Sequence, residues 1–346
     1  MFFRFLVALF LFSQCSISLP AQVEEVESES IPSAPAAEMP RDSSLAEFTQ
    51  SWQPASLSPM PGEWNGTDVA PRSQGQRSSP SIFDEFSALL AMDGSKQPQD
   101  LGVNANAGLQ ASMNWGLPIW PSRSIGLQVG TNMTATQNAV RVYELLGEST
   151  TRSQNFTTVG AFQRLDNGFA WGGVYDFLYE DSYDHFMLGQ WRLRASYAIA
   201  ARDEIGATTQ LRSTSDTGNW NFNTPITLSP INQASTYWRR FWSTGAQTTL
   251  WVGVADSHGE NNIVTGLSPA KDDSFLYGAD VFMPLTRSLA IYGEANMITP
   301  FDTGTVDAFL GIQWFPGCRA AQARRGKFSP LLPTASPVTF STDWSR

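Results

Sequence analysis

The feature that most constrains this fold is a strict two-residue alternation of apolar and polar side chains over unusually long runs. Between Leu101 and Leu117 every odd-numbered residue is apolar, and every even-numbered residue is polar or glycine. Side chains on a β-strand alternate between two faces, whereas those on a helix repeat every 3.6 residues. This run therefore predicts one long β-strand with an apolar face and a polar face.

Three further segments show the same alternation: Ile125–Thr136, Phe169–Glu180 and Met187–Ala201. Strands in soluble β-sandwiches usually run about five or six residues, whereas strands that cross a membrane need about nine to eleven. The length of these runs predicts strands that cross a membrane.

Further patterns extend the count of strands. They predict strands at Ile205–Ser213, Tyr237–Ser243, Gln247–Asp256, Ser274–Leu285, Leu289–Thr299 and Thr305–Phe315. Two weaker patterns add strands at Asp84–Asp93 and Asn155–Arg164. Tight turns between strands alternate with longer stretches at Gln137–Ser153, Thr214–Thr236 and Ser257–Asp273, which is typical of bacterial barrels with an even number of strands. The sequence thus predicts an all-β fold, a single antiparallel transmembrane-type β-barrel of about twelve strands within residues 81–316. The segment Asp84–Asp93 is also compatible with a short helix, which would leave an odd number of strands.

The composition agrees with a barrel whose outer surface faces lipid. Charged residues make up 16% of the chain and aromatic residues 12%, whereas soluble domains carry about a quarter charged residues. The mean hydropathy is only −0.21, as expected if one face of each strand meets lipid and the other does not. The net charge of −10 argues against a nucleic-acid partner, which would need a basic surface.

The two ends of the chain differ from the predicted barrel. Residues 1–21 predict a signal peptide, because Arg4 precedes an apolar run that is too short to span a membrane and small residues follow it. Residues 22–80 are acidic and rich in Pro and Ser, so they predict a disordered linker. Residues 317–346, with prolines and a basic cluster, predict a disordered, solvated tail. We expect export to the cell outer membrane, with the linker and the tail in the periplasm.

Charged residues within the predicted strands are tolerable only if they face a polar interior. The candidates for such a lumen lining are Asp176, Glu180, Arg192, Arg194, Arg212, Asp280, Glu294 and Asp307. A lining of mixed sign would tune the ion selectivity of a pore, or the charges would pair and fill a closed interior. About eight strands give a filled barrel and sixteen an open channel, so twelve strands leave both alternatives open.

The leading functional hypothesis is a porin-like barrel that lets small polar solutes or ions pass. The alternative is a closed structural or surface-binding barrel of the outer membrane whose long loops contact a partner. The sequence does not specify an oligomeric state.

We expect no enzyme, metal or cofactor. The Asp-Thr-Gly triplets at 216–218 and 302–304 resemble aspartic-protease cores, but neither follows a buried apolar run. The two histidines, His185 and His258, fall in predicted loops without metal-ligand spacing.

Three short stretches carry a resemblance to a known family. Asp100–Asn106, Asn114–Pro118 and Phe169–Tyr179 resemble uncharacterised exported proteins that are common in planctomycete bacteria. The resemblance covers roughly the region after the linker. It implies a barrel-like domain and brings no catalytic residue with it.

Overall fold

The computed structural model describes residues 83–96, 106–138, 147, 150–220, 224–256, 274–299 and 305–345. The predicted signal peptide and linker, residues 1–21 and 22–80, lie outside the described residues. The predicted strands fall within the described residues, except that residues 101–105 of the strand predicted at Leu101–Leu117 lie outside them.

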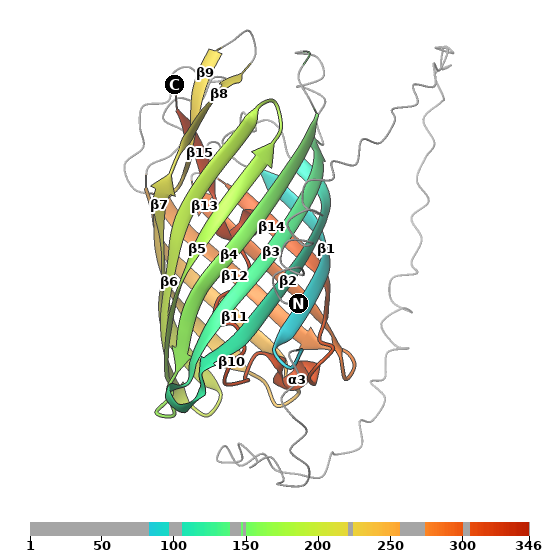
Figure 1. The fold of residues 1–346 in the computed structure, drawn as a ribbon, viewed down its shortest axis with the longest axis vertical. Helices are drawn as coiled ribbons and strands as arrows, with labels where there is room; N and C mark the ends of the chain where they lie inside the picture. The colour runs from blue at the N-terminus through green and yellow to red at the C-terminus, as the bar shows by residue number, and fades with distance from the viewer. Residues whose placement is uncertain are drawn as a thin grey trace, which may run out of the picture. The chain divides into compact units, whose positions relative to one another are not determined.

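Twelve long antiparallel strands close into a barrel (Figure 1). They are β1 (Phe86–Lys96), β2 (Asn106–Trp120), β3 (Ile125–Asn138), β4 (Thr151–Arg164), β5 (Phe169–Asp181), β6 (His185–Ala200), β7 (Asp203–Thr214), β10 (Gln233–Phe241), β11 (Gln247–Ala255), β12 (Ser274–Pro284), β13 (Leu289–Thr299) and β14 (Val306–Trp314). The barrel closes where β14 pairs with β1, with Trp314 opposite Ala88. The predicted barrel of about twelve strands is confirmed, and the ambiguous segment near Asp84–Asp93 forms strand β1.

Exposure alternates along the strands as the sequence pattern requires. On β6, Trp191 and Tyr197 are about half exposed (49% and 50%), whereas Arg192 between them is only 2% exposed. The apolar side chains therefore point outward and the polar ones inward. The predicted register of β6 is confirmed.

The outward face carries a belt of exposed apolar side chains. Its aliphatic and methionine part includes Leu90, Met92, Leu109, Met133, Leu193, Leu250, Val252, Leu310 and Ile312. Most of the exposed aromatic side chains lie near the short turns: Phe83, Trp120, Trp171, Tyr197, Trp238, Trp242 and Trp314. Phe177, Trp191, Phe275 and Tyr277 are exposed elsewhere on the wall. No helix among the described residues is long and apolar enough to cross a lipid bilayer.

The connections differ at the two ends of the barrel. One end has short turns, including the 3₁₀ turn η3 (Pro121–Arg123) and the turn at Leu165–Gly168. In the latter, Gly168 adopts a φ of +86°, which side chains with a Cβ rarely tolerate. At the other end, the stretch predicted as a loop between Thr214 and Thr236 instead forms a hairpin of β8 (Asp216–Trp220) and β9 (Thr224–Pro230).

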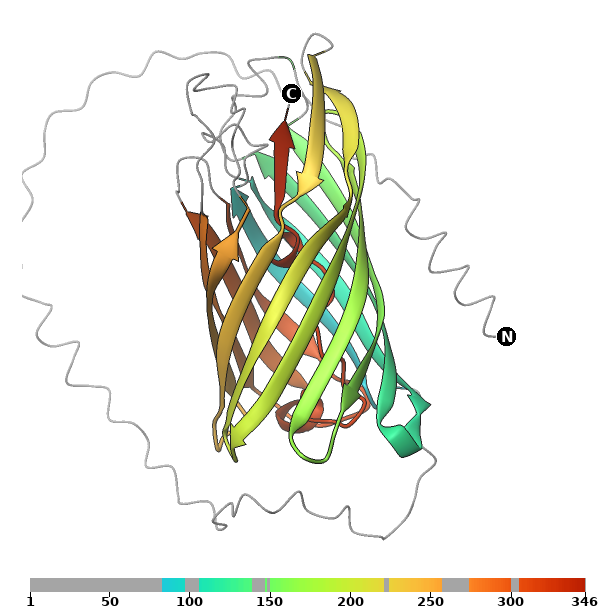
Figure 2. The same cartoon turned by 90° about the vertical axis from the view of Figure 1, so that its left-hand side faces the viewer.

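The C-terminal segment runs back through the barrel, so the prediction of a disordered, solvated tail is wrong for residues 317–345. It turns at α3 (Ala320–Ala323) at the short-turn end, passes the 3₁₀ turn η4 (Pro337–Thr339) and ends in β15 (Thr342–Ser345), which pairs with β9 (Figure 2). Between α3 and η4 the segment forms no regular element. Side chains of the barrel wall, and not a helix or a sheet, supply hydrogen bonds to its backbone there. The described end of the chain therefore lies at the long-loop end, opposite to the end where β14 finishes.

Candidate functional site

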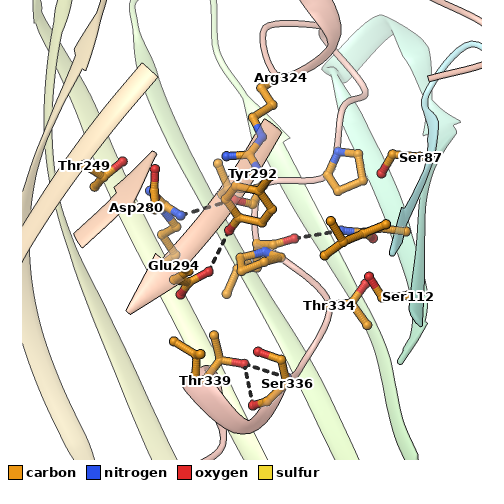
Figure 3. Close-up of a pocket in the computed structure, with 18 of the residues that line it drawn as sticks. Ser87, Ser112, Thr249, Asp280, Tyr292, Glu294, Arg324, Thr334, Ser336 and Thr339 are labelled. Carbon is orange, nitrogen blue, oxygen red and sulfur yellow. Dashed lines mark hydrogen bonds between the residues drawn. The ribbon is translucent and has the colours of Figure 1, made fainter. Parts of the chain in front are cut away.

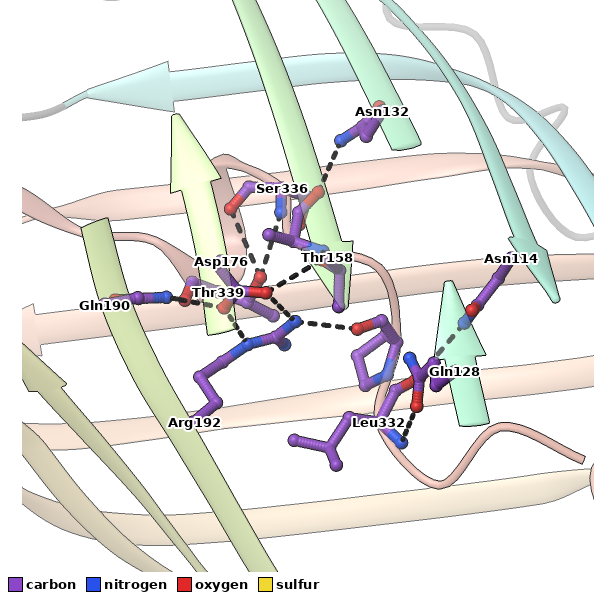
Figure 4. Close-up of polar contacts among 12 residues, drawn as sticks. Asn114, Gln128, Asn132, Thr158, Asp176, Gln190, Arg192, Leu332, Ser336 and Thr339 are labelled. Carbon is purple, nitrogen blue, oxygen red and sulfur yellow. Dashed lines mark hydrogen bonds and ion pairs between the residues drawn. The ribbon is translucent and has the colours of Figure 1, made fainter. Parts of the chain in front are cut away.

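The inner wall formed by β2–β6 holds the C-terminal segment through its backbone (Figure 4). The Gln128 amide donates to the carbonyl of Leu332 (2.6 Å), and the Leu332 N–H donates back to Gln128 Oε1 (3.3 Å). Asn132 Nδ2 donates to the carbonyl of Ala335 at 3.0 Å. These two amide side chains, both on β3, therefore hydrogen-bond the backbone of the extended segment as a partner strand would.

A buried ion pair forms the centre of this seat. Asp176 is fully buried and Arg192 nearly so, and the guanidinium donates to the carboxylate through Nε and Nη2. Arg192 Nη2 also donates to the carbonyl of Pro333 at 2.8 Å. Thr158 Oγ1 donates to Asp176 Oδ1 (2.8 Å) and accepts from the N–H of Ala335 (2.9 Å). Both residues of the ion pair are therefore connected to the tail: Arg192 directly at Pro333, and Asp176 through Thr158 at Ala335.

Apolar side chains of the tail fill the remaining lumen on this side. Phe340, which is 1% exposed, packs on Phe156 with ring centroids 5.8 Å apart. Leu331 and Leu332 pack in a second cluster with Phe162. A third cluster joins Val338 to inward-facing residues of β1 and β12–β14. The tail is thus part of the hydrophobic core of the barrel.

Four large apolar residues of β4–β6 face the lumen, and none of them was among the residues predicted to line it. Phe156, Leu178, Phe186 and Leu188 are all completely buried and point into the lumen beside Asp176. The sequence of β4–β6 contained a signal for them, because large apolar residues interrupt the polar face of these strands. A water-filled channel would not favour such residues, so this pattern indicates a packed interior.

The structure places the predicted lumen residues in three settings. Asp176, Glu180, Arg192 and Asp307 are buried in the barrel, with Glu180 accepting from Gln154 Nε2 at 2.7 Å. Arg194, Asp280 and Glu294 line a cavity together with Arg192. Arg212 lies at the long-loop rim, where it pairs with Asp256 at 3.6 Å and both side chains are about half exposed (42% and 50%). The eight residues therefore do not form one site.

A second group of charges lies beside the first, on the neighbouring strands β6, β7 and β10. Glu204, which the sequence analysis did not single out, accepts from Arg239 Nη1 (3.3 Å) and from the Tyr237 hydroxyl (2.9 Å). Arg194 Nε donates to the same hydroxyl at 2.9 Å, and its guanidinium carbon lies 4.3 Å from the Tyr237 ring centroid. Glu204 is thus shared by the two arginines, and the Tyr237 hydroxyl and ring give Arg194 further contacts within the wall.

A cavity of about 170 Å³ lies beside the tail in the lumen, and its lining comes from the tail and from β1, β2, β4, β6, β7 and β10–β14 (Figure 3). Asp280 and Glu294 are directly opposite each other on β12 and β13 and both line it. Glu294 accepts from the Tyr292 hydroxyl at 2.6 Å. The guanidinium of Arg324, from the tail, lies 3.9 Å from the Tyr292 ring centroid.

The Asp-Thr-Gly triplets and the histidines considered for catalysis or metal binding do not come together in one site among the described residues. The triplet at 216–218 lies on the exposed hairpin strand β8, while residues 302–304 and His258 lie outside the described residues. His185 contacts Asp181 and Tyr179, each at 3.3 Å, near the start of β6. Among the described residues, no three His, Cys, Asp or Glu side chains gather in a way that could hold a metal ion.

A family model described as "Family of unknown function (DUF6666)" matches residues 85–342. The chain belongs to this family. The part of this DUF6666 chain that matches begins just before β1 and continues past β14 into β15, so it includes the tail inside the lumen. A search of the curated proteins found no match.

Solved structures with a similar fold are outer-membrane barrels. The translocator domain of the autotransporter NalP from Neisseria meningitidis is 8% identical, with a TM-score of 0.43, covering 66% of this DUF6666 chain and 87% of that one. The KdgM porin is 6% identical, with a TM-score of 0.38 and coverages of 66% and 98%. Outer membrane phospholipase A from Escherichia coli is 8% identical, with a TM-score of 0.38 and coverages of 70% and 94%.

Proposed function

We propose that this protein is a self-plugged barrel of the outer membrane, with a structural or surface-presenting role and no catalytic step. The observation that carries the proposal is the passage of the C-terminal segment through the whole lumen, bonded to the wall and packed into its core. Porin-like passage needs a continuous water-filled path, and in this arrangement the tail occupies that path.

The outer surface supports a membrane location. Exposed fractions of 72% for Met92, 63% for Val252 and 66% for Phe275 would be costly in water, because large exposed apolar patches are rare on soluble proteins. Strands of 9–16 residues are long enough to cross an apolar layer about 25 Å thick when tilted. Aromatic residues at one end match the girdle that barrels place at the membrane interface.

The long-loop end supports a presenting role. There β15 adds to the hairpin of β8 and β9, in the order β15-β9-β8, so the tail supports the hairpin from inside the barrel. The hydroxyl groups of Thr217 and Thr227 in the hairpin form a hydrogen bond of 2.9 Å on an exposed surface. In an outer membrane this end would face outward, since long loops are extracellular in such barrels.

Porin-like passage of small polar solutes is the second candidate, and it requires the tail to leave its seat. The polar cavity beside the tail and the mixed-sign lining of Arg194, Asp280 and Glu294 support it. In this candidate the tail would act as a gate, and in the first candidate it is a permanent part of the core.

Planar-bilayer conductance tests the proposal. Purified full-length protein, shown to be folded by heat-modifiable gel migration, is expected to give no stepwise currents. A chain truncated after Phe328 lacks the lumen segment and is expected to conduct. Stepwise currents from the folded full-length protein would refute the self-plugged barrel and favour the porin-like candidate.

A further inference from the structure

The cavity beside the tail contains buried polar groups that have no partner. The side chains of Gln233 and Gln247 are 4% and 1% exposed. Both polar atoms of the Gln233 amide and Nε2 of Gln247 lack a hydrogen bond, as does Oε1 of Gln210, which is opposite Gln233 on β7. Buried amides are nearly always bonded, so such groups indicate a missing partner.

These amides share the cavity with other unsatisfied atoms of both hydrogen-bonding types. Asp280 Oδ1 and Gln110 Oε1 are acceptors without a donor, and Arg164 Nε is a donor without an acceptor. All of them line the same space. The missing partner must therefore both donate and accept hydrogen bonds, as hydroxyl groups do.

The charges around the cavity are balanced. Five arginines line it within the described part of the chain: Arg164, Arg192, Arg194, Arg239 and Arg324. Five carboxylates lie in its lining or pair with those arginines: Glu85, Asp176, Glu204, Asp280 and Glu294. A bound molecule with a net charge would disturb this balance in a buried space, so the electrostatics favour a neutral occupant.

Aromatic rings complete the lining. Trp251 donates to Asn296 Oδ1 at 2.9 Å, which fixes its indole at the cavity. Tyr237, Tyr292 and Phe309 also line it. Apolar ring faces beside convergent polar groups are the usual composition of small-molecule sites. A volume of about 170 Å³ is below the roughly 300–1,000 Å³ of sites for drug-sized ligands, so it limits the ligand to a small one.

We propose that this cavity binds a neutral polyhydroxylated solute of monosaccharide size through the amides of Gln210, Gln233 and Gln247. The tail forms one wall of the site, so the site rests on the self-plugged barrel of the proposed function. The hydroxyl groups would satisfy the unpartnered amides and Asp280 Oδ1, and the rings would cover the apolar faces of the solute.

Saturation-transfer NMR and calorimetry on the full-length protein in detergent test this site, with D-glucose and sorbitol as neutral probes and D-glucuronate and D-glucosamine as charged probes. Saturation transfer to the neutral probes, with weaker binding of the charged ones, is the expected result. The double substitution Gln233→Leu and Gln247→Leu should weaken binding by about tenfold or more, since it removes three unpartnered hydrogen-bonding atoms together with Gln247 Oε1. The fold should keep most of its stability, because the three unpartnered atoms have no hydrogen bond to lose.

The matched control is Gln154→Leu, a buried inward-facing glutamine on β4 that bonds Glu180 outside the cavity lining. It should leave probe binding unchanged. Folded, non-conducting protein that binds none of the neutral probes would show that water alone fills the cavity and would overturn the site. Tighter binding of a charged probe, or equal binding by the double variant, would also overturn it. Conductance by the full-length protein is a separate outcome that refutes the plug.

Discussion

Substitution of Arg192 tests whether the tail is held by the buried ion pair. In Arg192→Met, the completely buried Asp176 keeps only Thr158 (2.8 Å) and Gln190 (3.1 Å) as donors. The carbonyl of Pro333 also loses its 2.8 Å hydrogen bond. Removing one partner of a buried pair costs about 3–5 kcal/mol, because the remaining charge is uncompensated. At a urea slope of about 3 kcal/mol per molar, the unfolding midpoint should fall by about 1–1.7 M.

The measurement is urea unfolding in detergent, followed by heat-modifiable migration and tryptophan fluorescence. The control is Arg212→Met at the rim, whose half-exposed pair with Asp256 should cost no more than about 1 kcal/mol. The double substitution Arg192→Met with Asp176→Leu should recover most of the loss, because an apolar replacement of both partners removes the unpaired charge. A small loss in the single variant, or a double variant less stable than the single one, would refute the reasoning.

Three further predictions concern the lipid face, the tail contact and the cysteine. Leu193→Arg places a charge on the outward face and should cost about 2–4 kcal/mol near mid-bilayer, reducing assembly in lipid vesicles relative to Thr214→Arg at the strand end. Gly116→Ala brings a Cβ against the carbonyl of Phe328, whereas at Gly94 the nearest atom is 4.0 Å away; trypsin should therefore cut the tail faster in Gly116→Ala than in Gly94→Ala. Burial and the carboxylates of Glu85 and Asp84 raise the pKa of the Cys318 thiol to about 11. Replacing Cys15 with serine leaves Cys318 as the single thiol of the chain. Its alkylation at pH 8 should be about a hundredfold slower in the folded protein than after unfolding. Equal rates would contradict the buried position.

The candidate site was only partly accessible from sequence. The inward placement of Asp176 and Arg192 followed from strand parity, because both lie on the polar face of alternating runs. Their role in holding the tail did not follow, since it depends on contacts between residues about 140 positions or more apart, such as Arg192 with Pro333. Glu204 and the unpartnered Gln233 gave no local pattern: Glu204 is recognised only by its pairing with Arg239 on β10, and Gln233 only by its place in the cavity lining.

The sequence alone was enough to predict the twelve strands of the barrel wall, their faces and the antiparallel barrel, but not β8, β9 or β15. Strand parity is a local property: a residue such as Trp191 or Arg192 points outward or inward according to its position alone. The position of residues 317–345 inside the barrel depends on the tertiary structure. Their apolar residues, such as Leu332 and Phe340, have no periodic order, so nothing local indicates what they pack against. Only when twelve strands close around them do the amides of β3 and the rings of β4 bind the tail, and its packing there decides between the open and the filled lumen that the sequence had left as alternatives.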